Sequence, residues 1–210
     1  PNGNRTYYLN RSQAPYLGPI VGLIAAQTGY ESIIESAYPQ LEKEYDFWTS
    51  QRQSPIGLSH YGNHASQAEL REFFETVKHR LGLPDADADG HEGTAYQALA
   101  ECESGWDFNS RYDRHCPDFC PIDLNTNLWL YENLLARWAP DTATSSNWQA
   151  AAEIRRERIS EFCWNEELGI FVDYDHRNSQ QSSVASVASF HPLWAGLATE
   201  EEAASVVNKL

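Results

Sequence analysis

A succession of amphipathic helices, with almost no strand pattern between them, most constrains what this chain can fold into. Apolar residues recur three and four positions apart, which is the period of an α-helix. The helices predicted in this way span residues 12–28, 32–51, 66–81, 94–102, 123–138, 145–162 and 199–210. Neither the helix–strand alternation of a parallel α/β sheet nor a glycine-rich phosphate loop is present. The sequence therefore predicts an all-α fold.

Proline, glycine and short polar residues mark the expected ends of several helices. Pro15 falls in the first turn of the first predicted helix, and Gly29 follows its last residue. Pro39 lies inside the second predicted helix and is expected to kink or split it. The residues expected to cap or open later helices are Ser66, Asp123, Ser145 or Ser146, and Thr199.

Three segments between the helices have patterns of their own. Residues 53–65 are rich in Gly, Pro, Ser, Asn and His and are predicted to form a loop. Residues 164–175 alternate around a glycine, which predicts a short hairpin. The alternating aspartates of residues 84–93 suggest a calcium loop, but Tyr96 stands where such a loop needs Glu. We therefore interpret residues 84–93 as a solvated linker.

The charge and hydropathy of the chain argue against two classes of partner. Its 15 Lys and Arg against 30 Asp and Glu give a net charge of −15, whereas nucleic-acid binders present a clustered basic face. No stretch of about 18 apolar residues could span a bilayer, and no signal-peptide pattern is visible. We expect no nucleic acid and no membrane among the partners.

Aromatic residues are abundant, with 7 Trp, 11 Tyr and 8 Phe. Flat rings stack on pyranose faces and carboxylates bind hydroxyls, so an acidic, aromatic-rich chain is typical of sugar-handling proteins. The alternative for any one ring is a place in the hydrophobic core.

The four cysteines carry little metal signal. A structural zinc site usually combines two close Cys or His pairs, and here only His115-Cys116 lies close to Cys120. Buried thiols or a single disulfide are expected, and no metal.

Residues 103–111 carry the clearest chemical signal. Asp107 lies between Trp106 and Phe108, and apolar neighbours favour the protonated form of a carboxylic acid. A glycosidic oxygen is a poor leaving group until it is protonated, so such an acid suits glycoside hydrolysis. The preceding Gly105 permits close approach of the backbone to a ligand. The alternative is that Asp107 caps a helix or pairs with Arg111.

Hydrogen-bonding side chains are also dense in residues 2–13, which hold three Asn, two Arg and one Gln. They directly precede the first predicted helix, so we expect them at its N-terminal end. Arginine forms bidentate pairs with vicinal hydroxyls or carboxylates. The alternative is that Ser12 caps the helix and that Arg5 and Arg11 are solvated.

Several motifs occur in the order found in one enzyme family. They are PNGNRTYYLNRSQAP, LEKEYDFW, SGWDFNSR, DLNTNLWLYENLL, WNEELGIFVDYD and FHPLWAG. With them the chain resembles, nearly end to end, the trehalase family of inverting glycoside hydrolases. The resemblance implies an (α/α)6 toroid of the six-hairpin glycosidase type, hydrolysis of α,α-trehalose with inversion, and no cofactor. It implies Asp107 as the general acid. The substrate-binding residues that it implies are Asn2, Arg11, Ser12, Gln13, Gly105 and Trp106.

The chain also departs from the family pattern. The Arg-Pro-Glu segment expected before SGWD is absent, and Arg71-Glu72 lies in a helix without the proline, so no role is transferred to it. Asn109 and Tyr112 replace the usual Ser and Trp. The residues that bind a second sugar are therefore not identified by motif. This leaves two alternatives to trehalose: another α-glycoside such as glucosylglycerate or mannosylglycerate, and a sugar-binding protein without catalysis.

An inverting mechanism needs a second carboxylate about 6.5–9.5 Å from the acid. The candidates within the chain are Glu103, Asp113, Asp118 and Asp123. The twelve helices of a complete toroid need well over 210 residues. We therefore expect residues 1–210 to form part of a single catalytic domain, with the base outside them.

Overall fold

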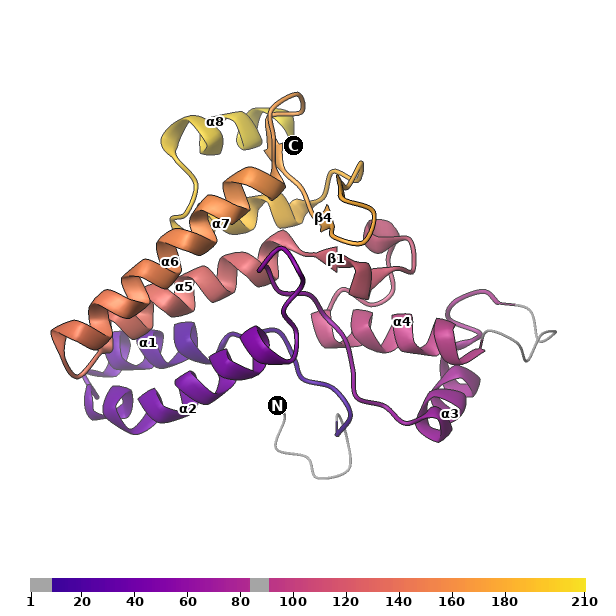
Figure 1. Ribbon diagram of the computed structural model, residues 1–210, viewed down its shortest axis with the longest axis horizontal. Coiled ribbons are helices and arrows are strands. Elements are labelled where there is room, and N and C mark those ends of the chain that lie inside the picture. Colours follow the sequence, from indigo (N-terminus) through magenta and orange to yellow (C-terminus); the bar gives the residue numbers. More distant parts are fainter. Residues whose placement is uncertain (1–8, 84–90) are drawn as a thin grey trace. The chain divides into compact units, whose positions relative to one another are not determined.

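The computed structural model describes residues 9–83 and 91–210 (Figure 1). The chain divides into two compact units, which are described separately. The first unit comprises Pro1–Ala14 and His60–Phe119, and the second comprises Pro15–Ser59 and Cys120–Leu210. The predicted linker at residues 84–93 lies largely outside the described residues.

In the first unit, two helices pack against each other. They are α3 (Gln67–Val77) and α4 (His91–Ser104). Leu70, Phe74, Ala95 and Leu99 form their shared core. The 3-10 helices η1 (Ser110–Tyr112) and η2 (Cys116–Asp118) follow α4, and η2 packs on it.

The start of α3 follows the prediction from the sequence. Ser66 is its N-cap, and its hydroxyl accepts from the backbone N–H of Glu69 at 3.4 Å. The Glu69 carboxylate accepts in return from the backbone N–H of Ser66 at 2.8 Å. This reciprocal capping box satisfies two backbone donors that a helix start leaves unpaired.

The second unit contains the longer helices. These are α1 (Leu17–Thr28), α2 (Ser32–Ser50), α5 (Ile122–Trp138), α6 (Thr142–Cys163), α7 (His191–Ala195) and α8 (Glu200–Lys209), with the 3-10 helix η3 (Val187–Phe190) before α7. Figure 1 shows α5 running beside α6, and α5 also contacts α1, α2 and α7. Leu41, Tyr131 and Leu135 form a buried cluster between α2 and α5.

Strands are few and short. β2 (Trp164–Asn165) pairs antiparallel with β3 (Ile170–Phe171), which confirms a hairpin within residues 164–175. A second pair, β4 (Tyr174–Asp175) with β5 (Gln180–Gln181), was not expected from the sequence. β1 (Phe119–Cys120) lies where the first unit gives way to the second along the chain. The predominance of helix agrees with the predicted all-α class.

The prediction of the first helix was right at its end and wrong at its start. Gly29 takes φ of +68° after Thr28 and closes α1 as predicted. The helix begins at Leu17 instead of residue 12, so Pro15 precedes it. Ser12 lies before α1, and its backbone N–H donates to the side chain of Glu103, which is distant in sequence.

Three other expected features differ from the structure. α2 is not split at Pro39 but continues as one helix, and Leu41 and Trp48, which are completely buried, anchor the turns that follow. Asp123 lies in the first turn of α5, behind an N-cap at Pro121. Asp141 caps α6 with a 2.8 Å bond from the Thr144 N–H, so the helix begins before Ser145. Thr199 caps α8 as expected.

A buried ion pair joins α5 to α6. Arg155 Nε lies 2.7 Å from Glu132 Oε1, and their side chains are 6% and 1% exposed. The Tyr45 hydroxyl donates to the same carboxylate at 2.6 Å, and Arg155 Nη1 donates to Asn125 Oδ1 at 3.2 Å. The charges are thus neutralised and hydrogen-bonded, which is the condition for burying them. No helix in the described part of the chain is long and apolar enough to cross a bilayer.

We predict that Arg155→Met lowers the free energy of unfolding by about 3–5 kcal/mol, because it leaves Glu132 buried and uncompensated. Urea titration followed by circular dichroism measures the change. Arg156→Met, on the exposed side of the same helix, is the matched control and should change stability by less than about 0.5 kcal/mol. Equal losses in the two variants would contradict the prediction.

Candidate active site

Asp107 lies just beyond the turn that ends α4. The helix ends at Ser104, and Gly105 follows with φ of +79°, in the left-handed region that favours glycine. Ser104 Oγ accepts from the backbone N–H of Trp106 at 3.0 Å and donates to the carbonyl of Glu101 at 2.6 Å. The Ser-Gly sequence thus turns the chain and places Trp106 and Asp107 past the helix end.

The Asp107 carboxylate is partly exposed and has one arginine beside it. Arg80 Nη2 lies 3.8 Å from Asp107 Oδ2, with side chains 65% and 29% exposed. The same guanidinium lies over the Phe108 ring, 4.8 Å from its centroid. Asn109, and not Asp107, caps η1, since its Oδ1 accepts from the Arg111 N–H at 2.7 Å. Because a solvent-exposed ion pair is weak, Arg80 leaves the carboxyl group open to a ligand.

Trp106 is held by a buried arginine. The Arg111 guanidinium lies 4.7 Å from the centroid of the Trp106 ring, and Arg111 is 4% exposed. A cation over an indole face is a favourable contact, so this pair fixes the ring next to Asp107. The sequence suggested an ion pair between Arg111 and Asp107, whereas the ion pair of Asp107 is made with Arg80.

Glu103 connects the N-terminal motif to the end of α4. Its side chain is buried, Oε1 accepts from the Ser12 N–H at 2.7 Å, and Oε2 accepts from the Gly62 N–H at 2.8 Å. Hydrogen bonds to an ionised acceptor are short and strong. Three segments far apart in sequence therefore meet at this one carboxylate, within the first unit.

The residues of the NRSQ motif are consequently placed at the end of α4. Arg11 Nη1 donates to Asn10 Oδ1 at 3.0 Å, and the Asn10 carbonyl accepts from the N–H of His64 at 2.7 Å. Gln13 is exposed. Asn2, the remaining predicted sugar ligand in this segment, lies outside the described residues.

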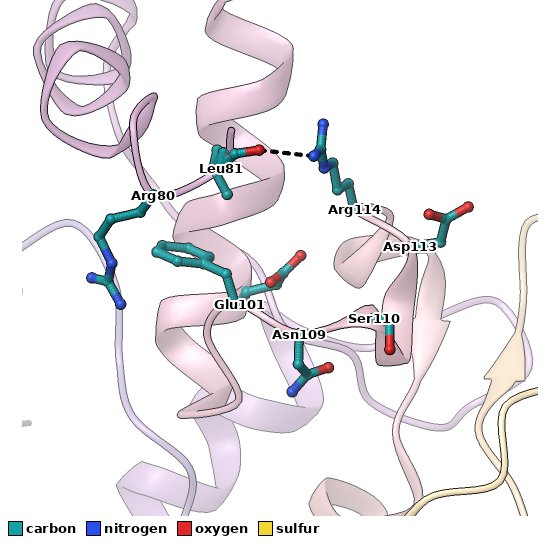
Figure 2. A pocket seen from close by; sticks show the side chains of 8 residues that line it. Arg80, Leu81, Glu101, Asn109, Ser110, Asp113 and Arg114 are labelled. Carbon is teal, nitrogen blue, oxygen red and sulfur yellow. Dashed lines mark hydrogen bonds between the residues drawn. The ribbon is translucent and has the colours of Figure 1, made fainter. Parts of the chain in front are cut away.

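A polar cavity of about 300 Å³ lies against the segment that follows Asp107 (Figure 2). We call it the Glu101 cavity, and its lining residues are Arg80, Leu81, Glu101, Phe108, Asn109, Ser110, Asp113 and Arg114. Glu101 comes from α4, while the residues from Phe108 onward come from the chain that follows it. Arg114 Nη2 donates to the carbonyl of Leu81 at 2.9 Å, which ties that chain to the segment after α3.

Glu101 is the titratable group that the sequence analysis missed. It is 3% exposed, and burial raises its pKa to about 7, with a further increase from Asp107 and an opposing effect of Arg114. The group therefore changes charge near neutral pH. A sequence signal was present, because Glu101 directly follows three apolar residues, Ala98 to Ala100, in the helix predicted at residues 94–102.

The other carboxylates weighed as a catalytic base have different surroundings. Asp113 lines the Glu101 cavity and has a positive φ of 44°. Asp118 lies 3.7 Å from His115 Nδ1. Asp123 is buried in the second unit. Within residues 9–83 and 91–210, no group of three or more His, Cys, Asp or Glu side chains could hold a metal ion.

The thiols are poor nucleophiles. All four cysteines are free, and Cys116, Cys120 and Cys163 are buried. Burial raises the pKa of Cys102 to about 11, with Asp107 adding to the increase, and raises that of Cys120 to about 12. A thiol needs to lose its proton before it can attack, so covalent thiol chemistry is not supported at neutral pH.

Comparison with known proteins gives one consistent family. The trehalase family model matches residues 1–210. A periplasmic trehalase from Xanthomonas campestris pv. campestris (strain B100) is 34% identical over 225 residues, covering 97% of this chain and 39% of that protein. A probable trehalase from Eremothecium gossypii is 30% identical, covering 99% of this chain and 34% of that protein. The chain thus spans less than half the length of these curated relatives.

Solved structures agree with the fold. The neutral trehalase of Saccharomyces cerevisiae superposes with a TM-score of 0.79 at 27% identity, covering 97% of this chain and 44% of that one. A GH63 mannosylglycerate hydrolase from Thermus thermophilus, in complex with glucose, gives 0.60 at 16% identity, covering 94% and 53%. The second likeness shows the fold alone. Together they confirm the predicted helical fold of the toroid glycosidase type.

We predict that the buried carboxyl group of Glu101 makes stability fall as pH rises. Below its unfolded pKa of 4.5 both states are protonated, and above the folded pKa of about 7 the charged form is buried at a cost. Relative to Glu101→Gln, the wild type should lose about 2–3 kcal/mol of unfolding free energy between pH 5 and pH 8. Urea titrations across this range measure it.

The control for this experiment is Glu72→Gln, which changes an exposed glutamate on α3. Its difference from the wild type should stay constant over the same range. If the difference in unfolding free energy between Glu101→Gln and the wild type were also constant, the raised pKa of Glu101 would be contradicted.

Proposed function

The chain belongs to the trehalase family of glycoside hydrolases, and we propose that it takes part in hydrolysing α,α-trehalose to two glucose molecules, with Asp107 as the general acid. The observation that carries the proposal is the position of Asp107. It follows the turn at Gly105, is partly exposed, and lies near a polar cavity whose lining includes Arg80 and the next residue of the chain, Phe108.

In the proposed reaction the proton moves from Asp107 to the glycosidic oxygen as the bond from that oxygen to C1 breaks. A water molecule attacks C1 from the opposite face and loses a proton to a second carboxylate. The attacked glucose is released as the β anomer and the leaving glucose as the α anomer. Two carboxylates and a water suffice, so the mechanism needs no metal and no organic cofactor.

We propose that the catalytic base lies outside these 210 residues, and that residues 1–210 form part of one catalytic domain. Glu103, the nearest candidate in the chain, has both oxygens hydrogen-bonded to backbone N–H groups and is buried. A carboxylate held in this way is a poor acceptor for a proton from water. Its geometry supports a structural role and leaves the base to be supplied by another residue.

The sugar at the cleaved bond is proposed to be held by the residues of the two motifs. The side chains of Arg11 and Gln13 carry N–H donors for the sugar hydroxyls. Ser12 and Gly105 place backbone groups near the end of α4, and Trp106 presents its indole ring. Asn2 is proposed for the same role from its motif alone. A small sugar is the partner, with neither nucleic acid nor membrane.

A second candidate is an α-glycoside other than trehalose, such as glucosylglycerate or mannosylglycerate. The absence of the Arg-Pro-Glu segment favours it, since that segment is part of the family pattern. Relative values of kcat/KM on trehalose and on these two compounds separate the candidates.

We predict that Asp107→Asn lowers kcat for trehalose by about 10²–10⁴-fold, because the leaving oxygen is no longer protonated. The rate is measured in the natural protein, with any sequence that flanks these residues in it. The same variant should retain most activity on α-glucosyl fluoride, because fluoride leaves without a proton. Glu167→Gln, an exposed change in the loop between β2 and β3, is the control. Unchanged trehalose turnover in Asp107→Asn would refute the role of this residue.

We also predict inversion at the cleaved bond. Proton NMR in the first minutes, before mutarotation, should show equal amounts of α- and β-glucose. Formation of α-glucose alone would mean retention and would exclude the two-carboxylate inverting mechanism. Binding of trehalose without any cleavage would instead indicate a sugar-binding protein without catalysis.

A further inference from the structure

The Glu101 cavity contains a buried acceptor that the proposed acid chemistry does not use. Glu101 is 3% exposed, and it lines the cavity. Among the described residues, the hydrogen bonds that end on Glu101 reach its backbone carbonyl, from Ser104 and Gly105, and none reaches its carboxylate. A buried carboxylate without donors is costly, so its donors are expected to come from the cavity.

The other polar groups of the cavity indicate a neutral ligand. Arg80 and Arg114 are balanced by Glu101 and Asp113, so the lining has no excess of either charge. Arg114 Nη2 donates to the Leu81 carbonyl, and the same guanidinium carries further N–H donors. A ligand with several hydroxyls, able both to donate and to accept, satisfies such a mixture.

The size and the apolar part of the lining suit a single sugar ring. A volume of about 300 Å³ is at the lower end of the range for small-molecule sites. Leu81 and Phe108 contribute apolar surface, which matches the C–H face of a pyranose. Asp107 does not itself line the cavity, but Arg80 lines it and lies 3.8 Å from Asp107, and Phe108 and Asn109 of the lining directly follow Asp107 in the chain. A ring in the cavity would therefore lie near the proposed acid.

Resting on the proposed function, we propose that the Glu101 cavity binds the leaving glucose. The Glu101 carboxylate accepts from one of its hydroxyls, and Arg114 donates to another. These residues would then supply the arginine and the carboxylate that the absent Arg-Pro-Glu segment does not provide. Glu101 is in this view a residue that determines specificity for the second sugar, separate from the residues of the NRSQ and SGWD motifs.

The test compares two substrates in the natural protein. Trehalose carries a second sugar, whereas α-glucosyl fluoride does not. Glu101→Leu and Arg114→Gln should each lower kcat/KM for trehalose by about 10–100-fold, as expected for the loss of a hydrogen bond to a charged group. Both variants should stay within about twofold of the wild type on α-glucosyl fluoride. Glu101→Gln, which keeps a carbonyl acceptor, should recover most of the loss of Glu101→Leu.

Two controls separate binding from other effects. Glu72→Leu, an exposed change on α3, should leave both substrates unaffected. If Glu101 instead acted on Asp107 through its charge, Glu101→Gln would lose as much activity on trehalose as Glu101→Leu, because neither side chain is charged. Equal losses on both substrates, no loss on trehalose, or equal losses of Glu101→Gln and Glu101→Leu on trehalose would overturn the proposal.

A binding measurement keeps the cavity testable if the wild type does not hydrolyse trehalose, which would refute the proposed function. Hydrogen exchange of residues 109–114 is followed on addition of glucose. Protection in the wild type that is lost in Glu101→Leu and kept in Asp107→Asn supports a sugar site in the cavity. Absence of protection in the wild type overturns it.

Discussion

The carboxylate of Glu103, with two backbone N–H groups bound to it, is the interaction on which the arrangement of the first unit depends. Ser12 and Gly62 are distant from each other and from α4 in sequence, yet the backbone N–H of each donates to one oxygen of the Glu103 carboxylate. Without that acceptor, two buried or half-buried donors would lose their partner, and the N-terminal motif would have no anchor at the helix end. A site that needs side chains from both segments therefore depends on a carboxylate whose two oxygens each accept a backbone N–H.

Three carboxylates within seven residues illustrate how surroundings decide the role of a side chain. Glu103 accepts a backbone N–H at each of its oxygens, while Glu101, on another face of the same helix, is buried beside a cavity without such donors. Asp107 lies past the helix end and is partly exposed. The same functional group is thus a structural anchor, a buried titratable acceptor and an accessible acid within one stretch of chain.

Features coded by neighbouring residues could be predicted from the sequence. Ser66, Gly29 and Thr199 mark helix ends as predicted because each acts on backbone groups within one turn. The start of α1 could not be predicted, since Ser12, expected at its first position, lies before the helix and donates its backbone N–H to Glu103, 91 positions away. In the candidate site, Asp107 was predicted from its motif and its role stays a prediction, whereas Glu101 was not predicted. Its surroundings depend on a loop that follows α4 and on the segment after α3.

A group with a pKa of about 7 in a sugar-sized cavity links ligand binding to protons. A hydroxyl that donates to the Glu101 carboxylate stabilises its charged form, so binding at neutral pH releases a fraction of a proton to the solvent. The heat of binding then varies with the ionisation enthalpy of the buffer. The affinity of the cavity for a neutral ligand is thereby coupled to pH, although the ligand itself carries no charge.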